Sequence, residues 1–219
     1  EHRYQFCLID PEGDYQNLEG AVVLGGPQSP PSVEETLRLL EDPQSSAVVG
    51  MTGMPIPDRP GLFLDLLSQL LEMRSRTGRP HWIILDEAHH LMPAEWRPAD
   101  GTLPHELQNF LLITVHPELL ATTLLQRINT VMILGGNAAE TLEVYADAVR
   151  QQVPEYAPRE LQPGELLLWE RDGNKPPLAV HVQPCQMERQ RHSRKYAVGE
   201  LPPDRSFYFR GPEGKMNLR

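Results

Sequence analysis

Apolar residues occur along the chain in short continuous runs that alternate with segments of helical period. The continuous runs predict β-strands at residues 4–9, 21–24, 47–49, 81–85, 110–115 and 130–134. The helical periods predict α-helices at residues 33–41, 61–76 and 138–149. Ser32 with Glu35 provides a capping box before the first helix, and Gly78 stops the second.

Strands that are apolar throughout and alternate with helices are typical of a parallel sheet covered on both faces. We therefore predict an α/β fold with a mostly parallel sheet flanked by helices. The strands near Leu8, Leu85, Ile113 and Ile133 are expected in the core of that sheet.

The pattern changes after residue 150. Short strands at 165–169 and 178–182 surround a turn at 171–174 and predict a β-hairpin. Beyond Pro184 the chain is polar and basic. We therefore expect a core over 1–150, a β-hairpin extension over 151–185, and a flexible basic tail over 186–219.

Charge divides the chain unevenly. The 219 residues carry 20 Lys and Arg against 30 Asp and Glu, a net charge of −10 at pH 7. Residues 186–219 hold eight of the basic and four of the acidic side chains, which leaves 12 against 26 in the first 185 residues. An acidic body disfavours nucleic acid as a partner, without excluding it, because phosphates repel it. The basic tail is either a phosphate contact or a solvated segment.

Cysteine content and hydropathy bear on location. The two cysteines, Cys7 and Cys185, cannot build a disulfide framework. Cys7 lies in an apolar run typical of a buried thiol, so we expect a reducing cytoplasmic location. No apolar run approaches the roughly 18 to 20 residues that cross a bilayer, and we expect no membrane partner.

The best chemical signal is a pair of adjacent carboxylates, Asp86 and Glu87, directly after the apolar strand 81–85. Ligands of open α/β sheets bind at the carboxyl ends of the strands. There, one carboxylate can hold a hydrated Mg²⁺ that bridges phosphate oxygens, and its neighbour can orient or deprotonate a water. The alternative is a solvated strand end before an ordinary helix.

Two further strand ends carry polar residues. The run 8–15 reads Leu-Ile-Asp-Pro-Glu-Gly-Asp-Tyr and contains Asp10 and Asp14, although a turn that needs Gly13 explains it equally. The run 111–117 contains Thr114 and His116. A loop histidine ahead of a helix is the alternative for His116. His89 and His90 are adjacent, which makes them a poor pair for one metal ion.

These runs resemble motifs of HerA/FtsK-type RecA-like P-loop ATPases. The resemblance covers residues 4–150 and implies ATP and Mg²⁺ as cofactors. It makes Asp86 the magnesium partner through water and Glu87 the general base, with Thr114 or His116 as the γ-phosphate sensor. Asp10 and Asp14 would lie on the nucleotide side. Val115 departs from the Thr/Ser-Gln-x-Pro pattern, in which it takes the Gln position.

The sequence contains no Gly-x-x-x-x-Gly-Lys-Ser/Thr loop, which cradles phosphates in these ATPases. Residues 211–216 imitate one, but their glycines are too close and Met216 replaces the hydroxyl. We therefore expect a fragment that starts after Walker A, with the strand, loop and helix of that motif ahead of Glu1.

The whole chain also resembles the ATPase part of bacterial two-part proteins that carry a haloacid-dehalogenase-type phosphatase. Three functions stay open: an ATPase module, a nucleotide-sensing or structural module that regulates such a phosphatase, and a DNA-translocating motor. A homo-oligomer is also open. In such an oligomer, Arg127 would be a candidate arginine finger that acts on the site of a neighbouring subunit. The alternative is a solvated surface arginine.

Overall fold

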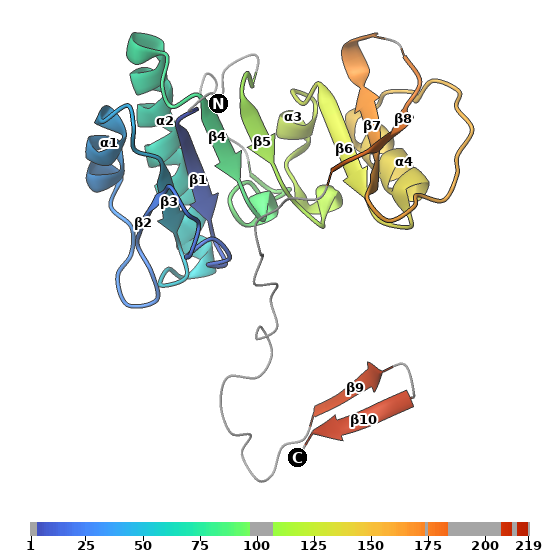
Figure 1. Ribbon diagram of the computed structural model, residues 1–219, viewed down its shortest axis with the longest axis horizontal. Coiled ribbons are helices and arrows are strands. Elements are labelled where there is room, and N and C mark those ends of the chain that lie inside the picture. Colours follow the sequence, from blue (N-terminus) through green and yellow to red (C-terminus); the bar gives the residue numbers. More distant parts are fainter. Residues whose placement is uncertain (1–3, 97–106, 174, 184–206, 212–213, 219) are drawn as a thin grey trace. The chain divides into compact units, whose positions relative to one another are not determined.

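The computed structural model describes residues 4–96, 107–173, 175–183, 207–211 and 214–218. The chain divides into two compact units, residues 1–184 and residues 185–219. The helices and the two larger sheets belong to the first unit (Figure 1). Among the described residues, no helix is both long and apolar enough to pass through a lipid bilayer.

A five-stranded parallel sheet forms the larger part of the first unit. Its order is β2-β3-β1-β4-β5. The strands are β1 (Phe6–Asp10), β2 (Val22–Leu24), β3 (Ala47–Gly50), β4 (Trp82–Leu85) and β5 (Phe110–Leu112). Every neighbouring pair is parallel. Continuous apolar runs suit β1 and β3 because both are flanked by strands on each side and are almost entirely buried. The predicted α/β class is confirmed.

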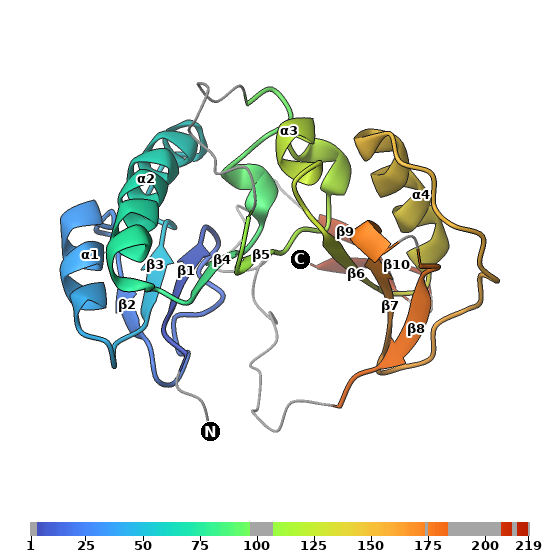
Figure 2. The same ribbon diagram turned by 90° about the horizontal axis from the view of Figure 1, so that it is seen from above.

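Two helices, α1 (Val33–Glu41) and α2 (Arg59–Thr77), lie on the same face of this sheet (Figure 2). The Ser32 hydroxyl accepts the N–H of Glu35 and begins α1, as the capping pair predicts. Gly78 ends α2 with a left-handed backbone, φ 71°. The apolar stripe of α2 packs on Ile9, Ile83 and the other core residues of the sheet.

The opposite face of the parallel sheet is only partly covered. Alternation along β4 and β5 turns Ile83 and Leu85 toward α2, so Trp82, Ile84 and Leu111 face the other way. Trp82 and Leu111 are each 39% exposed. The expectation that helices cover both faces is therefore not met among the described residues. The apolar pattern of a strand indicates that both of its faces can be buried. It does not show that a helix of the described residues covers each face.

The strand that contains Ile133 does not join the parallel sheet, and this prediction was wrong. Strand β6 (Thr130–Leu134) lies in a separate antiparallel sheet with β7 (Glu165–Glu170) and β8 (Leu178–His181). Ile133 pairs with Leu167. The reason is the hairpin β7–β8, which returns along β6 and gives it a partner far along the sequence.

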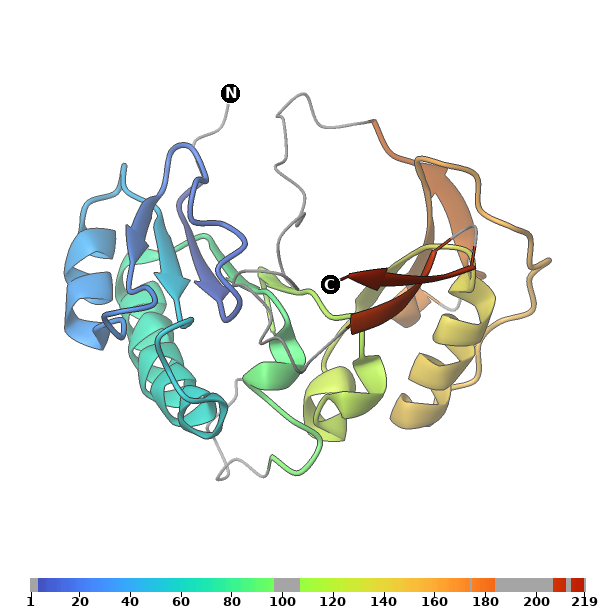
Figure 3. The ribbon, with the colours of Figure 1, turned by 90° about the horizontal axis from the view of Figure 1, so that it is seen from below.

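Helix α4 (Ala138–Val149) has the predicted bounds and packs on one face of this second sheet (Figure 3). Its Tyr145 meets the buried Trp169 of β7 edge-to-face, with ring centroids 6.3 Å apart. Short helical turns connect the rest: η1 (Ile56–Asp58), η2 (Ala88–His90), η3 (Pro117–Leu119), α3 (Thr122–Leu125) and η4 (Arg171–Gly173). Strand β6 pairs with β7, so a division of the chain at residue 150 stays a prediction.

The second unit contains a two-stranded antiparallel ribbon. Strand β9 (Phe207–Gly211) pairs with β10 (Gly214–Leu218), and Gly211 lies opposite Gly214. Residues 211 and 214–216 of the imitated phosphate loop therefore belong to a β-ribbon, not to a strand-to-helix turn. The basic residues before β9 lie outside the described residues.

Candidate active site

The carboxyl ends of β1, β4 and β5 meet at one edge of the parallel sheet because the strands run in the same direction. The Asp86 N–H donates to the Ile9 carbonyl over 3.0 Å, and the Ala88 N–H donates to the Ile113 carbonyl over 2.9 Å. Strand β5 ends at Leu112 and is shorter than predicted, because Leu85 is the last residue of β4 that pairs with it. This edge carries three of the predicted site residues: Asp10, Asp86 and Thr114.

Asp10 is fully buried, and the loop that follows it occupies both of its carboxylate oxygens. One oxygen accepts the N–H of Gly13 at 2.7 Å and that of Asp14 at 3.0 Å, and the other accepts the N–H of Tyr15 at 2.9 Å. Gly13 has φ +81°, a left-handed backbone that glycine adopts without strain. These contacts account for Asp10 as the residue that folds the loop. Direct contact with a nucleotide stays a prediction for Asp10 and Asp14.

Asp86 is the carboxylate best suited to a cation. It is 6% exposed. Burial, together with the smaller effect of the nearby charges of Glu87, Asp10 and Asp14, raises the pKa of its carboxyl to about 6. A cation in this place would relieve that repulsion. Hydrated Mg²⁺ fits one such carboxylate because it keeps several waters and takes one or two carboxylates from the protein.

A metal ion held by several side chains is a different matter. In the part of the chain that the structure describes, no group of three His, Cys, Asp or Glu could hold an ion directly. The rings of His89 and His90 lie 4.2 Å apart and tilted by 39°, packed on each other. Asp86 is therefore the residue to consider for magnesium, through water.

Glu87 adopts a left-handed backbone, φ 41° and ψ 49°. This conformation costs a non-glycine residue about 1–2 kcal/mol. Its Oε2 is buried and has no hydrogen-bond partner. The nearest base is His89, whose Nδ1 lies 3.5 Å from that oxygen. The left-handed backbone and the buried oxygen without a hydrogen bond make Glu87 a candidate functional residue.

Thr114 is the centre of a small hydrogen-bonded group after β5. Its Oγ1 lies 3.0 Å from His89 Nδ1 and also accepts the backbone N–H of His116 at 3.0 Å. The His116 ring meets the His89 ring edge-to-face, with centroids 5.4 Å apart. Its Nδ1 lies 3.1 Å from Glu118 Oε1. The structure thus brings Glu87, Thr114 and His116 around one residue, His89.

Sequence reasoning missed His89 as a member of this group and considered it only as a metal ligand. Its position two residues after Glu87 was the available signal. The left-handed turn at Glu87 was needed to show that His89 points back to Glu87 and Thr114. His90 turns elsewhere and pairs with Glu12 at 3.3 Å. Arg127 follows α3, and its role across a subunit interface stays a prediction.

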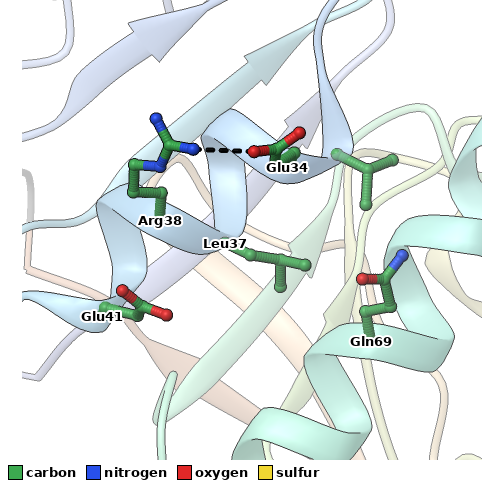
Figure 4. A pocket seen from close by; sticks show the side chains of 6 residues that line it. Glu34, Leu37, Arg38, Glu41 and Gln69 are labelled. Atoms are coloured by element: carbon green, nitrogen blue, oxygen red, sulfur yellow. Dashed lines mark hydrogen bonds and ion pairs between the residues drawn. The ribbon is translucent and has the colours of Figure 1, made fainter.

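A separate hollow of about 480 Å³ lies between α1 and α2 (Figure 4). It is lined by Val33, Leu37, Glu41, Gln69 and the ion pair Glu34–Arg38, whose side chains are 2.7 Å apart. Its charged side chains include two carboxylates, which suit phosphates poorly, and it contains no residue of the strand-end group.

No protein-family model and no curated protein matches the chain. Solved structures do. The genome packaging NTPase B204 from Sulfolobus turreted icosahedral virus 2 in complex with ATP-gammaS aligns with a TM-score of 0.54 at 12% identity, covering 83% of each chain. The same NTPase in complex with AMPPCP aligns with a TM-score of 0.51 at 12% identity, covering 84% of this chain and 85% of that one. At this identity the likeness concerns the fold. The parallel sheet with its flanking helices therefore has a RecA-like α/β fold, similar to that of this NTPase.

Proposed function

We propose that these residues are the Walker B and sensor half of a Mg²⁺-dependent P-loop ATPase. One observation carries the proposal: a buried carboxylate with raised pKa and a backbone-strained carboxylate whose Oε2 accepts no hydrogen bond stand side by side after β4, near Thr114, which follows β5. The complexes of the similar NTPase B204 with ATP-gammaS and with AMPPCP are consistent with it.

Each residue has a distinct role in this proposal. Asp86 accepts hydrogen bonds from the water shell of magnesium, which when bound neutralises charge on the phosphate oxygens. Glu87 accepts a proton from the attacking water, and its buried Oε2 accepts no hydrogen bond from the protein. Thr114 donates its hydroxyl hydrogen toward the γ-phosphate. Asp14 adjoins this side of the site through the loop that Asp10 folds.

In this proposal the phosphate loop is supplied by residues other than these 219, which contain no Gly-x-x-x-x-Gly-Lys-Ser/Thr motif. Two strand edges that have no pairing partner among the described residues support a place for it. Strand β5 ends the parallel sheet and β6 ends the second sheet. Apolar side chains next to these edges are exposed: Leu111 by 39%, Met132 by 56% and Leu134 by 75%. A strand paired along β5, followed by a helix over Trp82 and Leu111, would bury this surface and bring its loop beside Asp86.

The test uses the longer protein that carries a glycine-rich loop. Wild type is expected to hydrolyse ATP only with Mg²⁺. Glu87→Gln keeps the shape and removes the base, so Mg·ATP still binds while kcat falls about 100-fold or more. Asp86→Asn instead weakens the Mg²⁺-dependent part of ATP binding. Asp65→Asn, on the exposed side of α2, controls for the loss of one negative charge. The 219 residues alone are expected to show no saturable ATP binding at micromolar concentration.

A second candidate is a nucleotide-sensing or structural module that regulates an attached haloacid-dehalogenase-type phosphatase. Val115 favours it, because this residue is 72% exposed at the position that is Gln in the HerA-like pattern. The adjacent His116 is engaged with Glu118. This candidate predicts slow turnover in wild type and no change in Glu87→Gln. Equal hydrolysis rates in these two proteins would therefore favour sensing over catalysis.

A further inference from the structure

We propose that His89 is a positioning residue that joins Glu87 to Thr114 and leaves the hydroxyl hydrogen of Thr114 free to point at the nucleotide. The link between the three side chains is a property of the described residues. Its use in turnover rests on the proposed ATPase function.

The link depends on a single nitrogen. His89 Nδ1 lies 3.0 Å from Thr114 Oγ1 and 3.5 Å from Glu87 Oε2. The His89 side chain is 10% exposed, and the rings of His90 and His116 pack against it. Its orientation is therefore fixed by contacts on two sides, and Nδ1 faces two oxygen atoms at once.

The position of the ring hydrogen follows from those neighbours. Burial and the adjacent His90 lower the pKa of His89, so the ring is neutral near pH 7 and carries one N–H. The Glu87 carboxylate can only accept hydrogen bonds, and its Oε2 has no other partner. A negative oxygen on the Nδ1 side favours the hydrogen on Nδ1 over Nε2.

The consequence appears at Thr114. A hydroxyl oxygen accepts two hydrogen bonds and donates one. Thr114 Oγ1 accepts the N–H of His116, and with the hydrogen on His89 Nδ1 it accepts that one too. Both acceptor positions are then filled from the protein. The Thr114 O–H therefore has to donate to a group outside this cluster, and a phosphate oxygen is a suitable acceptor. Thr114 Oγ1 has no acceptor position left for another donor.

The first experiment uses the 219-residue chain and needs no nucleotide. Two-bond ¹⁵N–¹H NMR correlations of the imidazole rings are recorded for wild type, Glu87→Gln and the control His181→Asn, which replaces an exposed histidine of β8. Wild type and His181→Asn are expected to carry the His89 hydrogen on Nδ1. Glu87→Gln is expected to move it to Nε2 in most molecules, because the new amide donates to Nδ1. A hydrogen on Nε2 in wild type, or one unmoved in Glu87→Gln, overturns the proposal.

The second experiment measures turnover in the longer protein with two amide replacements. An Asn amide puts N–H near the Nδ1 position, and a Gln amide puts it near Nε2. We expect His89→Ala and His89→Gln to lower kcat about tenfold with little change in KM, and His89→Asn to recover most of the loss. Equal losses in His89→Asn and His89→Gln would overturn the positioning role. If wild type shows no turnover, the ATPase proposal fails, and the NMR result still decides the link.

Discussion

The N–H of Asp86, directly after β4, donates to the carbonyl oxygen of Ile9 near the end of β1 over 3.0 Å, which ties the two strand ends together. The bond draws the Asp86 carboxyl into the sheet, close to the charge of Asp10. Burial and like charge at this position make Asp86 costly to ionise, and the cost is measurable in the absence of ligands.

Asp86→Asn is predicted to stabilise the metal-free protein at neutral pH. Folding raises the pKa of Asp86 from 3.8 to about 6, so the native state holds this proton more tightly than the unfolded state. That stabilisation is complete below the unfolded pKa and is lost as pH rises to about 6. Asn keeps the shape and never ionises. Urea unfolding in EDTA should show a gain of about 1–3 kcal/mol at pH 7.5.

The same comparison at pH 4.5 is its control, because there the gain should shrink by more than half. An equal gain at both pH values would mean that the substitution acts through packing and not through the carboxylate charge.

Glycine at position 87 is predicted to relieve backbone strain. Glu87 has φ 41°, which glycine adopts freely. Glu87→Gly should exceed Glu87→Ala in free energy of unfolding by about 0.5–1 kcal/mol, after the greater entropy of unfolded glycine is counted. Ala88→Gly, in the turn that follows, should lose stability instead. Chemical denaturation of the three variants measures both differences, and a less stable Glu87→Gly would contradict the prediction.

Arg171 is predicted to be a large single contributor to the stability of the second sheet. Its guanidinium donates to the carbonyls of Leu125 and Ile128, and also to the Tyr145 hydroxyl. Arg171→Met should cost about 2–4 kcal/mol, because these acceptors lose their donor in a partly buried place. Thermal unfolding measures the loss.

Lys175→Met provides the matched control for that loss. The Lys175 and Glu170 side chains are 3.6 Å apart and are 70% and 57% exposed. Exposed pairs of this kind contribute at most about 0.5–1 kcal/mol. Losses of similar size in both variants would argue against a special role for Arg171.

Cys7 is predicted to be inert in the folded protein. Burial raises the pKa of its thiol to about 12, so at pH 8 the reactive thiolate is nearly absent. In a Cys185→Ser background, an aromatic disulfide reagent should label Cys7 only as fast as the protein unfolds. The labelling rate should rise with denaturant. Rapid labelling without denaturant would show that β1 opens locally.

Local signals in the sequence were sufficient for several elements. Ser32 and Gly78 mark helix ends through contacts within four residues, and α4 begins and ends as predicted. The carboxyl-edge cluster followed from strand direction alone. Strand pairing depends on residues far apart in the sequence. The pattern around Ile133 fits a strand of either sheet, and its pairing with Leu167 places it in the second one. The contact of His89 with Thr114 depends on the left-handed backbone of Glu87, and a glutamate at this position does not predict that conformation.

The open edge of β6 bears on how the chain behaves in concentrated solution. The strand reads Thr-Val-Met-Ile-Leu, with no charge or proline, and in the part of the chain that the structure describes it pairs only with β7. Natural edge strands are usually blunted by lysine, proline or a bulge, because a bare edge recruits strands from other molecules. The bare edge is expected to limit the concentration at which this chain stays in solution, and Met132→Lys should raise that limit.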